Sequence, residues 1–271
     1  MRFGWNGSVE AHIKTNAYIC ALQKQMTQFK HDNVTPYKSE VGKKNQVKSM
    51  FDSIARSYDF LNHFLSLGSD ILWRKIALNK IAGFNHNQIL DVATGTGDLA
   101  LEACKKFSPD HIFALDIAVN MLEIGKIKAK KAGKDKIIDF VAGDSEDLQF
   151  EDNRFDTVMS SFGVRNFENL DKGLSEMYRV LKPGGVIMVL EFSRPRVFPI
   201  KQLYSFYFKY ILPTIGKWIS KDNKAYHYLY ESSSAFPCFE EFLAVLNKIG
   251  FKNSRYHALS FGICSVYVAE K

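Results

Sequence analysis

A glycine-rich turn between a short apolar segment and an amphipathic segment constrains the fold of this chain more than any other feature. Residues 88–94 are mostly apolar, Gly95 and Gly97 follow, and a helical pattern occupies 99–107. Glycine lets the backbone approach a ligand closely because no side chain stands in the way. A strand, a glycine-rich turn and a helix in this order are typical of nucleotide-binding folds.

The alternation of strand and helix continues beyond this turn. This order predicts an α/β fold with a Rossmann-like, doubly wound and mostly parallel sheet, which binds its ligands at the carboxyl ends of the strands. Residues 251–257 and 260–269 predict two closing strands that form a hairpin at the sheet edge. The other predicted strands and helices follow the turn, over 111–116, 119–131, 137–142, 155–160, 171–181 and 186–192.

Two segments differ from this alternating pattern. Residues 1–45 are weakly patterned and predict a loosely ordered extension. Met26 is an alternative start of the protein, and a chain that begins there still contains the whole patterned region. Residues 46–271 are predicted to form the domain, which begins with at least two amphipathic helices. Within it, 196–235 are predicted as a helical insert over the substrate, because ten aromatic side chains crowd into 196–230.

Composition limits the class of protein and the kind of site. The chain has 271 residues, 46% of them hydrophobic and 24% charged, and its four cysteines stand far apart. There is no C-x-x-C pair and no run of about 18 apolar residues, so we expect a cytoplasmic protein without a metal site or a transmembrane helix. The net charge of +7 suits an anionic surface or a nucleic acid without requiring either.

Acidic residues around the turn distinguish between two cofactors. The spacing of Gly95 and Gly97 also satisfies the dinucleotide fingerprint, so an NAD-dependent oxidoreductase is an alternative. Asp116 follows the next strand and suits the ribose hydroxyls of either cofactor. Asp98 would repel a pyrophosphate at the helix N-terminus, whereas it would attract the ammonium group of a methionyl moiety. The charge therefore favours S-adenosylmethionine.

The end of the third predicted strand adds a further polar contact. Asp144 and Ser145 suit the exocyclic amine of an adenine. Three carboxylates around one nucleoside fit S-adenosylmethionine, which carries a sulfonium and no phosphate. In the alternative interpretation, Asp98 only caps its helix and Asp144 only caps a turn.

The segment after the fourth predicted strand, Ser160-Ser161-Phe162-Gly163-Val164-Arg165-Asn166, indicates the kind of methyl acceptor. It contains no Pro-Pro-aromatic turn for a flipped base, and no cysteine lies nearby, so we expect no nucleic acid partner. Arg165 and Asn166 suit a phenolate or quinol oxygen, because a guanidinium and an amide stabilise developing negative charge. Alternatively, Arg165 pairs with Glu168 on the surface.

The chain resembles the C-methyltransferase family of ubiquinone and menaquinone biosynthesis (UbiE/MenG) over about 47–271. It departs from the family's pattern at Gln149, where proline is usual, and residues 1–45 have no counterpart. The resemblance implies S-adenosylmethionine contacts at Thr96, Asp116, Asp144, Ser145 and Ser161. The segments that carry it include Asp91-Val-Ala-Thr-Gly-Thr-Gly-Asp98, Ser161-Phe-Gly-Val-Arg-Asn166, Glu176-Met-Tyr-Arg-Val-Leu-Lys-Pro-Gly-Gly185 and Tyr228-Leu-Tyr-Glu-Ser232.

The resemblance also implies a reaction, the C-methylation of a polyprenylated quinol. We expect 2-demethylmenaquinol as acceptor, with the methoxybenzoquinol precursor of ubiquinone or another aromatic compound as alternatives. A nonenzymatic RNA- or lipid-binding module would explain the charge but not the acidic residues around the turn. The ring carbon is a poor nucleophile until the neighbouring hydroxyl loses its proton. We expect Asp98 to accept that proton directly or through a water, Arg165 and Asn166 to place the ring oxygen, and Tyr58 to close the site.

The aromatic, basic insert has a purpose under this interpretation. A prenyl tail must be taken from a bilayer, and aromatic side chains with lysines suit a membrane interface. We therefore expect peripheral contact with the inner face of a membrane. Alternatively, the aromatic side chains form the core of a helical cap.

Overall fold

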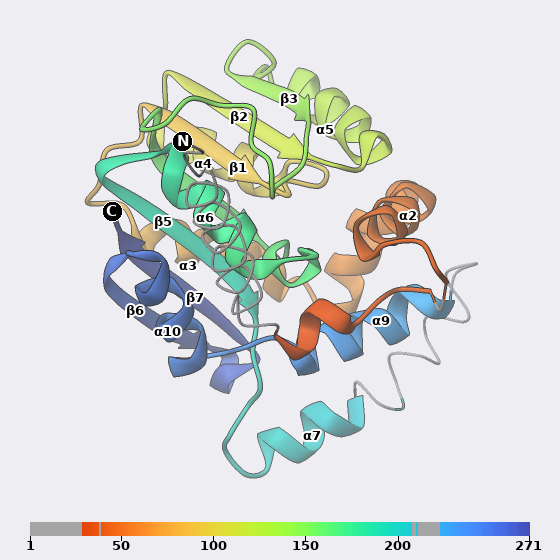
Figure 1. The fold of residues 1–271 in the computed structure, drawn as a ribbon. Coiled ribbons are helices and arrows are strands. Elements are labelled where there is room, and N and C mark those ends of the chain that lie inside the picture. Colours follow the sequence, from red (N-terminus) through yellow and green to blue (C-terminus); the bar gives the residue numbers. More distant parts are fainter. Residues whose placement is uncertain (1–28, 38, 208–209, 211–222) are drawn as a thin grey trace, which may run out of the picture.

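Figure 1 shows the fold in a computed structural model, which describes residues 29–37, 39–207, 210 and 223–271. The side chains at 61, 64, 65, 223, 224 and 226 are also left out of the description. Met26, most of the predicted N-terminal extension, and Phe208 and Trp218 of the predicted insert lie outside the described residues.

A seven-stranded sheet in the order β3-β2-β1-β4-β5-β7-β6 forms the centre of the molecule. The first five strands pair in parallel and β7 pairs antiparallel with both of its neighbours, so the predicted parallel sheet with a closing hairpin is confirmed. The strand order reverses between β1 and β4, and in such sheets ligands bind beside the carboxyl ends at that point. The strands are β1 (Gln88–Val92), β2 (His111–Asp116), β3 (Ile138–Ala142), β4 (Phe155–Ser161), β5 (Leu181–Phe192), β6 (Lys252–Leu259) and β7 (Cys264–Glu270).

Helices cover both faces of the sheet, because alternate residues of the buried strands point to opposite sides. Ile89 belongs to the hydrophobic cluster formed with α3 (Ser69–Lys80), α4 (Asp98–Phe107) and α5 (Val119–Lys131). The next residue, Leu90, belongs to the cluster formed with α6 (Leu170–Val180) and α10 (Glu240–Ile249). Because both faces are covered, the inner residues of the parallel strands are mostly apolar.

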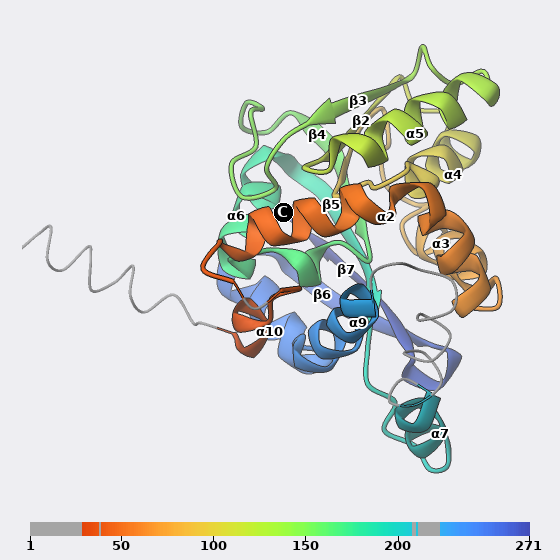
Figure 2. The ribbon, with the colours of Figure 1, turned by 90° about the vertical axis from the view of Figure 1, so that its right-hand side faces the viewer.

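Three helices lie beyond the carboxyl ends of the parallel strands. Figure 1 shows β1, β2 and β3 pointing toward α2 (Lys43–Leu65), with α9 (Asn223–Ala235) beside it and α7 (Ile200–Phe206) standing away from the sheet. Figure 2 confirms that α2 runs across this side of the molecule. The position of α2 agrees with the prediction of amphipathic helices before the sheet. Within the part of the chain that the structure describes, no helix is long and apolar enough to span a membrane.

The structure differs from the sequence prediction at the N-terminus. Lys30–Asn33 form a 3-10 helix whose His31 is fully buried and stacks edge-on against Phe236. The buried Lys43 donates a 2.7 Å hydrogen bond to the carbonyl of His31. The turn over Lys30–Asn33 and the side chain of Lys43 therefore pack onto the domain. Their pattern gave no sign of this because buried polar groups, together with apolar residues that follow no helical or strand period, make the contacts.

Two boundaries also differ near the end of the sheet. The strand expected from 186 begins at Leu181, and its pairing with β4 shifts register between Phe155 and Thr157, which accommodates the glycines at 184 and 185. The segment expected as a strand from 260 first forms a 3-10 turn over Ser260–Gly262, and β7 begins at Cys264. The turn contains Phe261 in a left-handed conformation, which a strand does not accommodate.

Candidate active site

The glycine-rich turn links β1 to α4, and its two glycines have different roles. Gly95 and Gly97 have φ angles of 59° and 80°, in the left-handed region that glycine tolerates best. A side chain at Gly97 would come within 2.8 Å of the ring of Phe140, so this glycine is needed for packing. Gly95 lines the pocket above the turn, whereas Gly97 is absent from the pocket lining.

Asp116 at the end of β2 holds the turn in place. Its carboxylate accepts hydrogen bonds from the backbone N–H of Gly95 (2.7 Å) and of Ala118 (2.8 Å). Burial raises the pKa of Asp116, while these two hydrogen bonds oppose the rise. The carboxylate is therefore fixed at the floor of the pocket, where β1 and β2 end side by side.

One polar pocket at the carboxyl ends of the strands collects most of the residues predicted to bind the cofactor. Of the residues predicted to contact the cofactor, only Gly97 does not line it. The predicted residues in its wall are Gly95, Thr96, Asp98, Asp116, Asp144, Ser145 and Ser161. We call this space the cofactor pocket.

Helix α2 closes the cofactor pocket through contacts that sequence reasoning missed. Lys44 donates a 2.6 Å hydrogen bond to Asp144, whose other oxygen accepts from the backbone N–H of Glu146 at 2.9 Å. Thr96 donates to Asp59 at 2.5 Å. The pocket then holds about 80 Å³, well below the roughly 300 Å³ of small ligand sites. These contacts of α2 therefore narrow the cofactor pocket.

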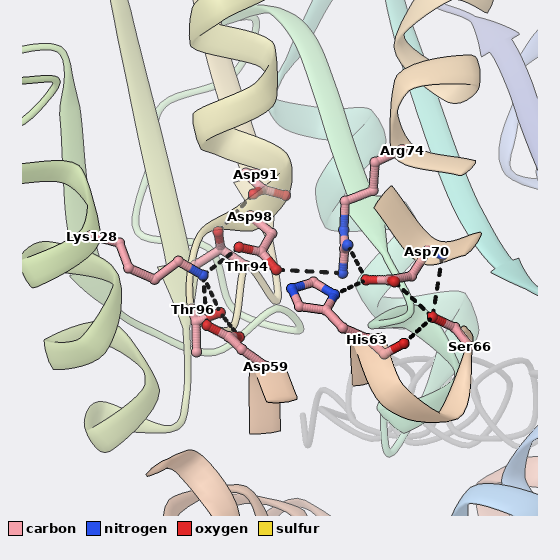
Figure 3. A network of polar contacts seen from close by, with 10 residues as sticks. All are labelled: Asp59, His63, Ser66, Asp70, Arg74, Asp91, Thr94, Thr96, Asp98 and Lys128. Atoms are coloured by element: carbon pink, nitrogen blue, oxygen red, sulfur yellow. Dashed lines mark hydrogen bonds and ion pairs between the residues drawn. The ribbon is translucent and has the colours of Figure 1, made fainter. Parts of the chain in front are cut away.

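Asp98 lies in the first turn of α4 and is surrounded by cations. It pairs with Lys128 of α5, and its other oxygen is 3.8 Å from Nη2 of Arg74 (Figure 3). Lys128 also donates to Asp59 at 2.8 Å and to Thr96 at 3.0 Å. Neither cation was assigned a role from the sequence, although Arg74 belongs to a Trp-Arg pair that is easily recognised.

A second, larger cavity of about 460 Å³ adjoins the cofactor pocket, and we call it the acceptor cavity. It lies between α2, α3, α7 and α9, and its wall is mostly apolar and aromatic. Three of the predicted catalytic residues, Tyr58, Arg165 and Asn166, line it, whereas Asp98 lines only the cofactor pocket. The residues shared by the two walls are Phe51, Tyr58, Arg74, Phe162 and Asn166.

The alternative interpretation of Arg165, a surface pair with Glu168, is wrong. Arg165 is buried, and its Nη1 donates to Glu191 at 2.7 Å and to the carbonyl of Phe162 at 2.5 Å. A 3-10 turn over Val164–Asn166 after β4 directs the side chain toward the neighbouring strand β5, where Glu191 is fully buried. In the sequence, Glu191 is the single glutamate of an otherwise apolar segment, and this feature could have indicated the partner of Arg165.

Four polar groups in the wall of the acceptor cavity remain without a hydrogen-bond partner in the described part of the chain. They are Nε of Arg74, Nε of Arg165, Oδ1 of Asn166 and the hydroxyl of Tyr228. Burial raises the pKa of Tyr228 well above its ordinary value, so its hydroxyl stays protonated. Buried polar groups normally have partners, so four such groups in one cavity indicate a ligand that bears oxygen or hydroxyl groups.

Comparison with known proteins shows which family the chain is similar to. The profile of the ubiE/COQ5 methyltransferase family matches residues 39–271. A Bacteroides fragilis protein named demethylmenaquinone methyltransferase is 47% identical over 90% of this chain and 99% of its own length. A protein of that name from Porphyromonas gingivalis is 43% identical over 89% of this chain and 98% of its own. A Geotalea daltonii protein named ubiquinone/menaquinone biosynthesis C-methyltransferase UbiE is 45% identical, over 84% and 97% of the respective chains.

Solved structures share the fold at low sequence identity. The cyclase SpnF superposes with a TM-score of 0.62 at 17% identity, over 84% of this chain and 96% of its own. A phosphoethanolamine N-methyltransferase of Haemonchus contortus, solved with S-adenosylhomocysteine, superposes with a TM-score of 0.56 at 16% identity, over 78% of this chain and 56% of its own. These likenesses concern the architecture alone.

Proposed function

Because the chain belongs to the ubiE/COQ5 methyltransferase family, we propose that it transfers a methyl group from S-adenosylmethionine to a ring carbon of 2-demethylmenaquinol. The observation that carries this proposal is the shared wall between an acidic cofactor pocket and an apolar acceptor cavity. Such a wall brings a methyl donor and an aromatic acceptor into contact in a site that excludes water. The names of the relatives from Bacteroides fragilis and Porphyromonas gingivalis support this choice of acceptor.

The residues of the cofactor pocket fit S-adenosylmethionine. Asp116 would hold the ribose hydroxyls, Asp144 and Ser145 the adenine edge, and Asp98 the methionyl ammonium. Three carboxylates suit a ligand that carries a sulfonium and an ammonium, and they would repel a pyrophosphate. When bound, the cofactor supplies an electrophilic methyl group.

The acceptor cavity fits a neutral quinol ring. Its apolar walls hold the ring and the first part of a prenyl tail, and Arg165 with Asn166 bind the hydroxyl next to the reacting carbon. The Arg165 guanidinium stabilises the negative charge on this oxygen once its proton has passed to solvent water, before the site closes. Tyr58 lies in both walls and closes the ring against the donor. We assign Asp98 to the ammonium rather than to the quinol proton, because it is ion-paired and does not line the acceptor cavity.

The test is methyl transfer from labelled S-adenosylmethionine to reduced demethylmenaquinone and, in parallel, to reduced 2-polyprenyl-6-methoxy-1,4-benzoquinone. We expect methylated product from the naphthoquinol. Product from the benzoquinol alone would replace menaquinol by the ubiquinone precursor, an acceptor that the name of the Geotalea daltonii relative also allows. No product from either quinol, with S-adenosylhomocysteine still bound, would refute quinol methylation.

We further propose that α7 contacts a membrane surface, from which the quinol enters. Phe198 and Phe206 are 78% and 56% exposed, while Leu203 and Tyr204 of the same region line the acceptor cavity. An exposed apolar segment at the rim of an apolar cavity suits the extraction of a prenylated ligand. In vesicle flotation with anionic lipids, Phe198→Ser/Phe206→Ser should lose binding, while Val41→Ser, at an exposed apolar residue before α2, should retain it. Equal binding of both variants would contradict the proposal.

A further inference from the structure

Arg74 of α3 lies where the cofactor pocket and the acceptor cavity meet, and it lines both. Arg74 is only 7% exposed. Nη1 donates a 2.6 Å hydrogen bond to Asp70, while Nη2 is 3.8 Å from Asp98, beyond hydrogen-bond distance. Its Nε has no hydrogen-bond partner in the described part of the chain. A guanidinium has five N–H donors, so this buried cation has donors left for a ligand.

The residues around Asp70 fix the position of Arg74. Asp70 is buried and accepts hydrogen bonds from Arg74 and from the hydroxyl of Ser66 at 2.7 Å. Nδ1 of His63 is 2.8 Å from the same carboxylate. Figure 3 shows this cluster on one side of Asp98 and Lys128 on the other. Three side chains, one from α2, one from α3 and one from the turn between them, thus fix this guanidinium beside the pocket. A structural ion pair alone does not need this arrangement.

From this geometry we propose that Arg74 binds the α-carboxylate of the methionyl part of S-adenosylmethionine, while Asp98 binds its ammonium. The inference rests on S-adenosylmethionine as cofactor and deepens that assignment. A cation and an anion 3.8 Å apart, without a hydrogen bond between them, are complementary to the zwitterion of an amino acid. In a site that excludes water, charge-assisted hydrogen bonds of this kind are strong.

Lys128 is the competing cation for the carboxylate, and its contacts argue against it. Its ammonium group is bound by Asp59, Thr96 and Asp98, and Lys128 does not line the cofactor pocket. Lys128 therefore holds α2 and α5 to the glycine-rich turn. Arg74 lines the pocket and has N–H donors that no protein group accepts in the described part of the chain. Because it lies in the shared wall, it would hold the methionyl group beside the acceptor cavity.

The experiment compares two ligands by calorimetry with the full chain. S-adenosylhomocysteine carries the amino acid group, and 5′-deoxy-5′-methylthioadenosine lacks it. Arg74→Met should weaken S-adenosylhomocysteine about 10- to 100-fold, the range for a lost charge-assisted pair, and leave methylthioadenosine within about twofold. Lys75→Met, which removes the exposed neighbouring cation on α3, should change neither. An unchanged S-adenosylhomocysteine affinity in Arg74→Met, or an equal loss for both ligands, overturns the inference.

A second measurement needs no variant and so does not depend on the folding of Arg74→Met. Decarboxylated S-adenosylmethionine keeps the sulfonium and the amine but lacks the carboxylate. It should bind the unaltered protein about 10- to 100-fold more weakly than S-adenosylmethionine, because Arg74 loses its partner. Equal affinities would overturn the inference. Neither measurement contains a quinol. If the proposed quinol acceptor is wrong, the two binding experiments still test the role of Arg74.

Discussion

The cofactor pocket and the acceptor cavity share a wall but are built in different ways. The floor of the cofactor pocket consists of strand ends and turns, such as the Asp116 carboxylate held by the backbone of Gly95. The acceptor cavity lies between four helices, two before the sheet and two after β5. Backbone hydrogen bonds set by the sheet therefore fix the first site, and helix packing fixes the second.

This difference separates cofactor from substrate specificity. Helices can be replaced or shifted without disturbing the ends of the strands, so one sheet serves many acceptors. The likeness to SpnF illustrates this, since a protein described as a cyclase shares the architecture with a TM-score of 0.62. We expect substitutions at the floor of the cofactor pocket to affect mainly cofactor binding. Substitutions in the acceptor cavity should affect mainly turnover.

The largest expected effect is on the cofactor side. Asp116→Ala removes the carboxylate assigned to two ribose hydroxyls and also frees the N–H groups of Gly95 and Ala118. Two charge-assisted hydrogen bonds correspond to about 3 to 4 kcal/mol, so Kd for S-adenosylhomocysteine should rise roughly 10²- to 10³-fold. Calorimetry measures this, with the exposed Asp110→Ala as control. A rise below tenfold would contradict the role of Asp116.

The next effect should be confined to the acceptor side. Arg165→Met alone would leave Glu191 buried without its partner, at a cost of about 3–5 kcal/mol of stability. Arg165→Met/Glu191→Gln avoids this, and we expect its kcat to fall roughly 10²-fold, as when one donor to a developing oxyanion is lost. Its affinity for S-adenosylhomocysteine should stay within about twofold.

The control for this double variant is Arg196→Met/Glu240→Gln, which removes a surface ion pair of 2.9 Å. Labelled methyl transfer and calorimetry on both double variants separate turnover from cofactor binding. Full turnover in Arg165→Met/Glu191→Gln would exclude the assigned role of Arg165, and a parallel loss of cofactor affinity would mean that the two sites are not separable.

The same contrast explains what the sequence could predict. Apolar runs and turns determine the sheet, so the positions of Asp116 and Asp144 at strand ends followed from the pattern. Contacts made by helices that fold over the site did not follow, because Lys44 is 100 positions from its partner Asp144. Arg74 and Asp59 escaped prediction for the same reason, since tertiary packing alone brings α2 and α3 to the turn.

Buried charged residues are the second kind of contact that the sequence did not predict. The sequence left a surface partner for Arg165 open as the alternative to a role in the site, because exposed ion pairs are common. The true partner, Glu191, stands inside an apolar strand, where the apolar neighbours indicated a strand but not the reason for a glutamate. The N-terminal segment was similar, because His31 and Lys43 are buried through hydrogen bonds that no periodicity reveals.

A smaller effect should follow from Tyr228→Phe in the acceptor cavity. The hydroxyl is buried without a partner in the described part of the chain, so its removal should leave the free energy of unfolding unchanged or raise it by up to about 1 kcal/mol. If the hydroxyl donates to the quinol, kcat/KM should fall roughly 5- to 20-fold, as for one neutral hydrogen bond. Urea unfolding and steady-state kinetics test the two effects. Unchanged kcat/KM would remove Tyr228 from the site.

The smallest expected effect concerns Asp91, at the end of β1 below the turn. One of its oxygens accepts a 2.6 Å hydrogen bond from Thr94, the other has no hydrogen-bond partner in the described part of the chain, and burial raises its pKa from 3.8 to about 7. A pKa raised by folding means that the folded protein binds the proton more tightly than the unfolded chain. The stability from Asp91 is therefore full below pH 3.8, is lost as the pH rises toward 7, and changes little above that.

Asp91→Asn imitates the protonated form and should remove this dependence. Between pH 5 and 7 the unfolding free energy of the unaltered protein should fall relative to that of the variant, by at most about 1.4 kcal/mol per pH unit. The difference should be constant above about pH 8. Urea titrations at four pH values measure it, with Asp110→Asn as the exposed control. A difference that grows in favour of the unaltered protein as the pH rises would show that the folded state prefers the charged carboxylate. The floor of the cofactor pocket would then carry its full negative charge before any ligand arrives.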